Sequence, residues 1–147
     1  MSKIAFDLHG VLDTIFIHEI LEKISKSHEI FILSGSPSIE IKETLFNINY
    51  LQDVHYHKVL SIVDYVKDEI KIPCYQKEST RTGKLNWYCD ENIWWTMKSV
   101  LCNKNRINVL FDDKTQYMRY FRLNEHPTKF NLVHNHTVFI DMLKEFL

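Results

Sequence analysis

Carboxylates follow two short apolar segments of this chain. Asp7 comes directly after residues 4–6, and Asp112 and Asp113 come directly after residues 107–111. Both segments are typical of buried parallel strands, whose carboxyl ends line the ligand crevice of an open α/β sheet. If the strands are neighbours, Asp7 and Asp112 meet at one point and repel each other unless a cation lies between them. The pattern predicts a Mg²⁺ site, because hard carboxylate oxygens hold this ion and leave room for a substrate phosphate.

A hydroxyl group and a glycine end a third apolar segment. Ser34 and Gly35 follow residues 30–33, and Ser36-Pro37 then begins a helix with Ser36 as the expected N-cap. A hydroxyl group and free backbone N–H groups at a helix start form a cradle for phosphate. We therefore expect Ser34 and Gly35 to bind phosphate. The alternative is that both serines only cap the helix.

Lys98 is the cation expected at the same site. It lies on a predicted helix that runs from residue 91 to about residue 103. Its neighbours one turn away are Trp94, Trp95, Leu101 and Cys102. A buried ammonium needs a counter-charge, and Asp7 together with a phosphate supplies one. Two alternatives stay open: the Lys98 stem reaches solvent past the tryptophans, or Lys84 in a nearby hairpin is the lysine of the site.

Three of these segments resemble motifs of the haloacid dehalogenase (HAD) superfamily. Its first motif, Asp-x-Asp-Gly-x-Leu, is similar to residues 7–12, Asp-Leu-His-Gly-Val-Leu. Its second, an apolar strand ending in Ser or Thr, is similar to residues 30–35. Its fourth is similar to residues 110–113, Leu-Phe-Asp-Asp. The three occur in the family's order, and Lys98 is the preferred candidate for the third motif, a Lys or Arg without fixed spacing.

The resemblance implies a phosphatase that works through an aspartyl-phosphate. Asp7 would be the nucleophile, and Mg²⁺ would be held by Asp7, Asp112 and the backbone carbonyl of His9. Asp113 would orient the lysine or support the metal ligands. Ser34, Gly35 and Lys98 would bind the phosphate. The implied activity is Mg²⁺-dependent hydrolysis of a nucleotide, a nucleic-acid end or another phosphomonoester.

His9 departs from the family pattern, because family phosphatases carry a second Asp there as general acid and base. An imidazole titrates near neutrality, so His9 can in principle donate a proton to a leaving oxygen and then activate water. The alternative is that the catalytic Asp is lost and the chain is an impaired phosphate-binding or interaction module. Asp13 is expected only to end the loop.

The apolar periodicity predicts an alternation of strands and helices. We expect strands at 3–7, 29–33, 54–60, 107–111 and 130–133, and helices at 15–27, from 36, and at 61–70, 91–103, 115–123 and 136–146. This order favours a three-layer, Rossmann-like α/β fold with a parallel sheet, formed by one domain of residues 1–147. Residues 71–90 interrupt the alternation and are expected to form a β-hairpin that is the sole candidate lid.

Composition narrows the class of partner. The net charge of −1 gives no electrostatic footprint for nucleic acid or membrane, and no apolar stretch is long enough to span a bilayer. Without a signal peptide, the three cysteines are expected to be reduced in a cytoplasmic protein. A small lid suits a substrate whose bulk stays outside the site. The oligomeric state cannot be inferred.

A phosphoacceptor receiver domain is a third class, because it also gathers acids, a hydroxyl and a lysine around an aspartyl-phosphate. In receivers the paired acids follow the first strand and the phosphorylated Asp comes later. Here the pair, Asp112 and Asp113, comes late in the chain, which favours the HAD-like order.

Overall fold

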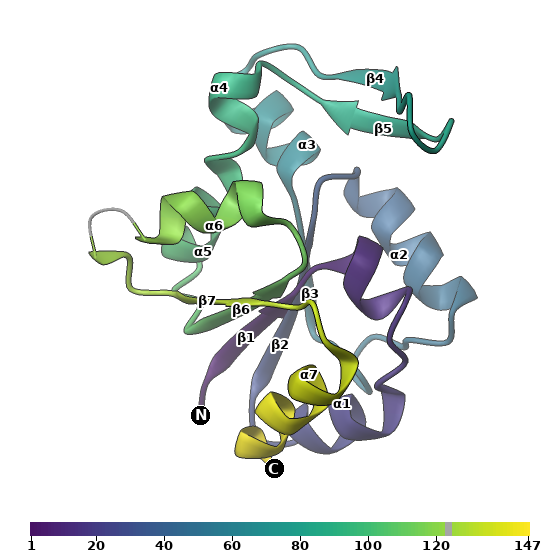
Figure 1. Cartoon of the computed structure of the whole chain (residues 1–147), viewed down its shortest axis with the longest axis vertical. Coiled ribbons are helices and arrows are strands. Elements are labelled where there is room, and N and C mark those ends of the chain that lie inside the picture. Colours follow the sequence, from purple (N-terminus) through teal and green to yellow (C-terminus); the bar gives the residue numbers. More distant parts are fainter. Residues whose placement is uncertain (123–124) are drawn as a thin grey trace.

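A parallel five-stranded sheet forms the centre of the computed structural model, which describes residues 1–122 and 125–147 (Figure 1). The strand order is β3-β2-β1-β6-β7, and every neighbouring pair is parallel. The strands are β1 (Lys3–Phe6), β2 (Glu29–Ser34), β3 (Lys58–Ser61), β6 (Val109–Asp112) and β7 (Lys129–Leu132). The expected α/β, Rossmann-like parallel sheet is therefore present.

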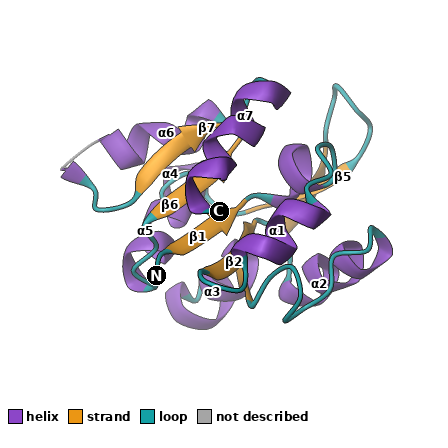
Figure 2. Cartoon of the chain, turned by 90° about the horizontal axis from the view of Figure 1, so that it is seen from below, coloured by secondary structure: helices purple, strands orange, loops and turns teal. Residues whose placement is uncertain are grey.

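Helices cover both faces of the sheet (Figure 2). They are α1 (His18–Ile24), α2 (Ser38–Asn47), α3 (Ile62–Tyr65), α4 (Glu91–Trp94), α5 (Met97–Lys104), α6 (Thr115–Arg122) and α7 (His136–Leu143). Among the residues that the structure describes, short turns of other helical type are η1 (Leu8–Leu12), η2 (Val66–Ile70) and η4 (Lys144–Phe146). No helix among the described residues is long and apolar enough to cross a membrane.

The two faces of the sheet have separate apolar cores, as strand alternation requires. Ile4 and Phe6 of β1 point into the core that contains α1 and α7, whereas Ala5 points into the core that contains α3 and α5. All three side chains are fully buried. Burial on both faces explains why the strands read as continuous apolar runs.

The segment 71–90 contains the expected antiparallel hairpin, β4 (Tyr75–Glu78) with β5 (Leu85–Tyr88). It lies beyond the main sheet, next to α4 (Figure 1). Trp87 Nε1 donates a hydrogen bond to Glu40 Oε2 of α2 at 3.0 Å, and Lys67 Nζ lies 5.4 Å from the centre of the Trp87 ring. These contacts attach the hairpin to the rest of the chain. The three cysteines are free thiols.

Two expected strand and helix starts are wrong. The third strand begins at Lys58 rather than at residue 54, because residues 51–57 form turns in which Leu51 N donates to His55 Nδ1 and Ile30 N donates to His57 Nδ1. The first helix covers His18–Ile24 instead of 15–27, since Ile15 N bonds to Val11 O in the preceding turn.

The predicted helix 91–103 is divided into α4 and α5. Thr96 Oγ1 donates to Ile93 O at 2.6 Å, and Thr96 N bonds to the same carbonyl three residues back. A hydroxyl that takes a helix carbonyl competes with the regular ladder and tightens the turn. The helix expected at 115–123 is found as far as Arg122, and residue 123 lies outside the described residues.

Candidate active site at the carboxyl edge of the sheet

Asp7 and Asp112 end neighbouring strands, and the structure brings their carboxylates together. Phe6 of β1 is in register with Phe111 of β6, and Asp7 N donates to Phe111 O at 2.9 Å. The two acids are 4% and 0% exposed. The sheet therefore fixes both backbones, and the side chains converge at the carboxyl edge of the sheet, where open α/β sheets bind their ligands.

The Lys98 ammonium joins the two carboxylates. Its Nζ donates to Asp7 Oδ1 at 2.9 Å and to Asp112 Oδ2 at 2.5 Å, and the residue is 1% exposed. The same ammonium lies 4.4 Å from the centre of the Tyr117 ring. Lys84, the alternative lysine, is exposed in the hairpin. Lys98 is thus the lysine that joins the two acids, and its side chain does not reach past the tryptophans into solvent.

Burial and charge act against each other at this cluster. Burial alone lowers the pKa of Lys98, but the charges of Asp112 and Asp7 outweigh it and hold that pKa above its ordinary value. For Asp7, burial raises the pKa, Lys98 lowers it and Asp112 raises it, with the balance above the ordinary value. Two carboxylates compete for one ammonium, so the cluster favours additional positive charge.

Asp113 adds a third carboxylate. Oxygens of Asp7, Asp112 and Asp113 lie within 4.8 Å of one another. A Cβ built on Gly10, whose φ is +90°, would lie 2.0 Å from Asp113 Oδ2, so only glycine admits this carboxylate beside the turn. Asp113 Oδ1 is buried and accepts no hydrogen bond from the described part of the chain.

This donor set fits a hard divalent cation. It offers only oxygen atoms, includes an unsatisfied buried carboxylate oxygen, and carries three acids against the one ammonium of Lys98. Carboxylate oxygens are the ligands that Mg²⁺ prefers. Asp7 and Asp112 are therefore side chains that could hold such an ion, with the Asp113 carboxylate beside them.

Ser34 and Gly35 lie at the same edge of the sheet, one strand away. Ser34 ends β2 and is 2% exposed. The expected N-cap role of Ser36 is wrong, because Pro37 occupies the N-cap position of α2 and the carbonyl of Ser36 accepts from Ser61 Oγ. Ser38 N donates to Asp64 Oδ2 at 3.0 Å. This first amide of α2 is thus occupied by a carboxylate, which leaves Ser34 and Gly35 as the candidate phosphate-binding residues of the loop.

His9 is exposed and forms a dyad with Asp13. Its Nδ1 lies 3.2 Å from Asp13 Oδ2, and its side chain is 54% exposed. Asp13 also accepts hydrogen bonds from Gly10 N at 2.7 Å and Thr14 Oγ1 at 2.9 Å. Burial alone raises the pKa of Asp13, but these donors and His9 hold it below its ordinary value. Asp13 therefore orients the His9 ring as well as ending the loop.

The sequence analysis missed the roles of Asp13 and Tyr117. The i, i+4 spacing of His9 and Asp13 was the available signal for their contact. Tyr117 carries no motif, and it reaches Lys98 only because α6 packs beside α5.

Comparisons with known proteins give no further guide: no family model, no curated protein and no solved structure matches this chain. The chemistry of the site is therefore the basis on which a function is inferred.

Proposed function

We propose that this protein is a Mg²⁺-dependent phosphohydrolase that forms an aspartyl-phosphate on Asp7. The observation that carries the proposal is the Lys98 ammonium, hydrogen-bonded to both Asp7 and Asp112 at the end of neighbouring strands. Together with Ser34 on the next strand, this arrangement agrees with the resemblance to the HAD superfamily. Asp7 is the nucleophile because it comes first in the motif-like segment 7–12.

The implied ion would be held by Asp7, Asp112 and the backbone carbonyl of His9, with Asp113 in support. When bound, Mg²⁺ supplies positive charge that offsets the phosphate oxygens and aligns the phosphorus for attack. Lys98 would hold a phosphate oxygen through its remaining N–H group, and Ser34 and Gly35 would bind the phosphate from the adjacent loop.

In the first step, a carboxylate oxygen of Asp7 forms a bond to phosphorus while the bond from phosphorus to the ester oxygen breaks. The departing oxygen takes a proton from the His9 imidazolium. Asp13 holds Nδ1 of that ring, so Nε2 is the nitrogen that exchanges the proton. Splitting the hydrolysis into two steps is the usual gain of a covalent intermediate.

In the second step, water attacks the phosphorus of the aspartyl-phosphate. The proton of the water moves to His9, and the bond between phosphorus and Asp7 breaks. Inorganic phosphate leaves, and the Asp7 carboxylate and the His9 imidazolium are restored.

The test is turnover of acetyl phosphate or glycerol phosphate with Mg²⁺ by the wild type and by Asp7→Asn. The variant keeps the size of the side chain and removes the nucleophilic charge, so we expect turnover to fall by about 10⁴-fold or more. Circular dichroism checks that the fold is intact. Undiminished turnover in Asp7→Asn would show that another residue is the nucleophile.

One observation favours the second candidate, a phosphate-binding module without turnover. His9 is half-exposed, and within the described residues its ring bonds to Asp13 rather than to Asp7 or Asp112. If His9 is the acid and base, His9→Ala loses about 10²–10⁴-fold in rate, and His9→Asp, which restores the family pattern, keeps or raises activity. If His9→Ala equals the wild type and only His9→Asp turns over substrate, the natural chain is the binding module.

A further inference from the structure

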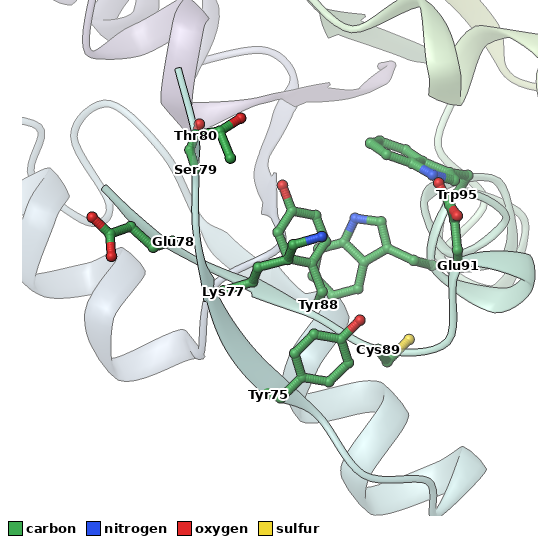
Figure 3. Close-up of a pocket in the computed structure, with 10 residues that line it drawn as sticks. Tyr75, Lys77, Glu78, Ser79, Thr80, Tyr88, Cys89, Glu91 and Trp95 are labelled. Atoms are coloured by element: carbon green, nitrogen blue, oxygen red, sulfur yellow. The ribbon is translucent and has the colours of Figure 1, made fainter. Parts of the chain in front are cut away.

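A pocket of about 340 Å³ lies between the hairpin and α4. Figure 3 shows Tyr75 and Tyr88 of the hairpin, with Glu91 and Trp95 across from them. Trp94 and the hairpin-tip residues Ser79 and Thr80 also line the pocket. This volume lies at the small end of the range for ligand pockets.

The strand register explains why the hairpin presents tyrosines to this pocket. Tyr75 and Tyr88 are directly paired, so their side chains share one face of the hairpin, and their ring centres lie 6.5 Å apart. Trp87 is on the opposite face, where it contacts Glu40 and Lys67. One face of the hairpin is therefore used for attachment, and the other is left to line the pocket.

The inner wall of the pocket borders the candidate active site. Trp94 packs against the phosphate-binding loop, since a Cβ on Gly35 would lie 2.7 Å from its Cζ2 atom. The Trp95 ring packs on Tyr117 with centres 4.9 Å apart, and Tyr117 in turn contacts the Lys98 ammonium. One ring thus separates the pocket from Gly35 and two rings separate it from Lys98.

The lining chemistry suits a flat, polar aromatic ring. Tyr88 and Trp94 have ring centres 5.5 Å apart, and Tyr75 is 51% exposed, so aromatic surface is left for stacking. Lys77 supplies a hydrogen-bond donor, and Glu91 supplies an acceptor. A lipid tail would find the charges of Lys77 and Glu91 unfavourable, whereas a nucleobase stacks on aromatic rings and offers edge donors and acceptors to these two side chains.

We propose that this pocket binds the base of a nucleotide whose phosphate reaches Asp7. The assignment of that nucleotide as substrate rests on the proposed function. The base stacks on Tyr75 and Tyr88, and the sugar passes Trp94 toward Gly35. The nucleotide is either a free mononucleotide or the phosphorylated end of a nucleic acid, since both carry the same base, sugar and phosphate.

Calorimetric titration with adenosine tests the pocket separately from hydrolysis, because adenosine has no phosphate. We expect the wild type to bind adenosine but not ribose, and Tyr75→Ala and Tyr88→Leu each to weaken binding about tenfold or more, the usual loss when a stacking ring is removed. Phe46→Ala is the matched control, since Phe46 is an exposed aromatic on α2 that is outside the pocket lining. It should bind adenosine like the wild type.

Absence of adenosine binding, or equal binding by the wild type and both tyrosine variants, overturns the proposal, even if acetyl phosphate is hydrolysed and the proposed function holds. Binding that depends on the tyrosines, with no hydrolysis of any phosphate ester, supports base binding and overturns only the proposed function. Hydrolysis of AMP and of a 5′-phosphorylated decanucleotide then separates the two sources. A lower KM for AMP identifies the free nucleotide, and a lower KM for the decanucleotide identifies a nucleic-acid end.

Discussion

The carboxyl edge of the sheet and the hairpin beside it differ in the kind of side chain that they carry and in how far those side chains are exposed. At the sheet edge, Asp7, Lys98 and Asp112 are at most 4% exposed, and Lys98 donates a hydrogen bond to each of the two acids. In the hairpin, Tyr75 and Leu85 are 51% and 62% exposed. The first region is buried charge at the ends of two core strands and on α5, and the second is exposed apolar surface, aromatic and aliphatic, on two strands.

Under the proposed function, the sheet edge would position the reacting groups and the hairpin would select the substrate. Charges buried at the ends of core strands are held by the sheet register, which suits groups that must meet a reacting phosphorus atom. A two-stranded hairpin is only marginally stable by itself, so its position depends on contacts such as that between Trp87 and Glu40. We therefore expect substitutions at the sheet edge to cost far more stability than substitutions in the hairpin.

Lys98→Met should give the largest effect. It leaves Asp7 and Asp112 buried without their ammonium, which typically costs about 3–5 kcal/mol of unfolding free energy. Lys84→Met in the hairpin is the control and should change stability by less than about 0.5 kcal/mol. Urea unfolding of both variants measures the difference.

The loss in Lys98→Met should also depend on pH. Burial already raises the pKa of Asp7, so the folded state binds this proton more tightly than the unfolded chain does. Lowering the pH therefore protonates the unpaired Asp7 in the folded variant and reduces the destabilisation, which should be larger at pH 8 than at pH 5. Equal unfolding free energies of Lys98→Met and Lys84→Met would show that the ion pairs of Lys98 with Asp7 and Asp112 contribute nothing to folding.

Gly35→Ala should give an intermediate effect, because Gly35 at the sheet edge contacts Trp94 of α4, which in turn packs beside Tyr88 of the hairpin. The new Cβ would lie 2.7 Å from Trp94 Cζ2, and Trp94 is only 4% exposed, so the ring must move. Overpacking of this kind costs about 1–3 kcal/mol. Tryptophan fluorescence and urea unfolding should both change.

Gly83→Ala is the control for that substitution. Gly83 has φ +69° at the hairpin tip, and its nearest Cβ neighbour is Glu78 Oε1 at 3.8 Å. Its alanine variant should be strained locally but should leave the tryptophan spectrum unchanged. A spectrum of Gly35→Ala that matches the wild type would mean that Trp94 does not press on the loop in solution.

Asp13→Asn should give the smallest effect on stability. The pKa of Asp13 lies below its ordinary value of 3.8, so its contribution is complete above that pH and is lost as the pH falls through the lower folded value. Its partner His9 is exposed, so the loss should stay under about 1 kcal/mol. Urea unfolding between pH 2 and 7 should show a shallower acid decline in Asp13→Asn, and an identical decline would exclude Asp13 as a contributor.

Several features of the site followed from local sequence. An apolar run predicts a buried strand, and a parallel sheet gathers the residues that follow such strands at one edge, so the meeting of Asp7 and Asp112 was predictable. Lys98 was predictable as well, because a lysine with apolar neighbours one helical turn away lies on a buried face and must find a counter-charge. The hairpin was predictable as well, because the polar residues 78–83 lie between two segments with apolar and aromatic residues.

The sequence did not predict contacts that depend on how distant elements pack. The amide of Ser38 bonds to Asp64, and the attachment of the hairpin depends on Trp87 meeting Glu40 of another element. The helix is divided between α4 and α5 at Thr96, whose hydroxyl competes with backbone N–H groups for the carbonyl of Ile93. The apolar periodicity of the helix does not predict this hydrogen bond.

The sequence by itself determined which residues end the strands and which chemistry they can support, because strand burial and side-chain alternation are local properties. Only the tertiary structure decided that Trp94 packs on Gly35, that Tyr117 reaches Lys98, and that an aromatic pocket borders the candidate site. These contacts arise from side chains that pack between elements, and their geometry depends on the whole core rather than on any one segment.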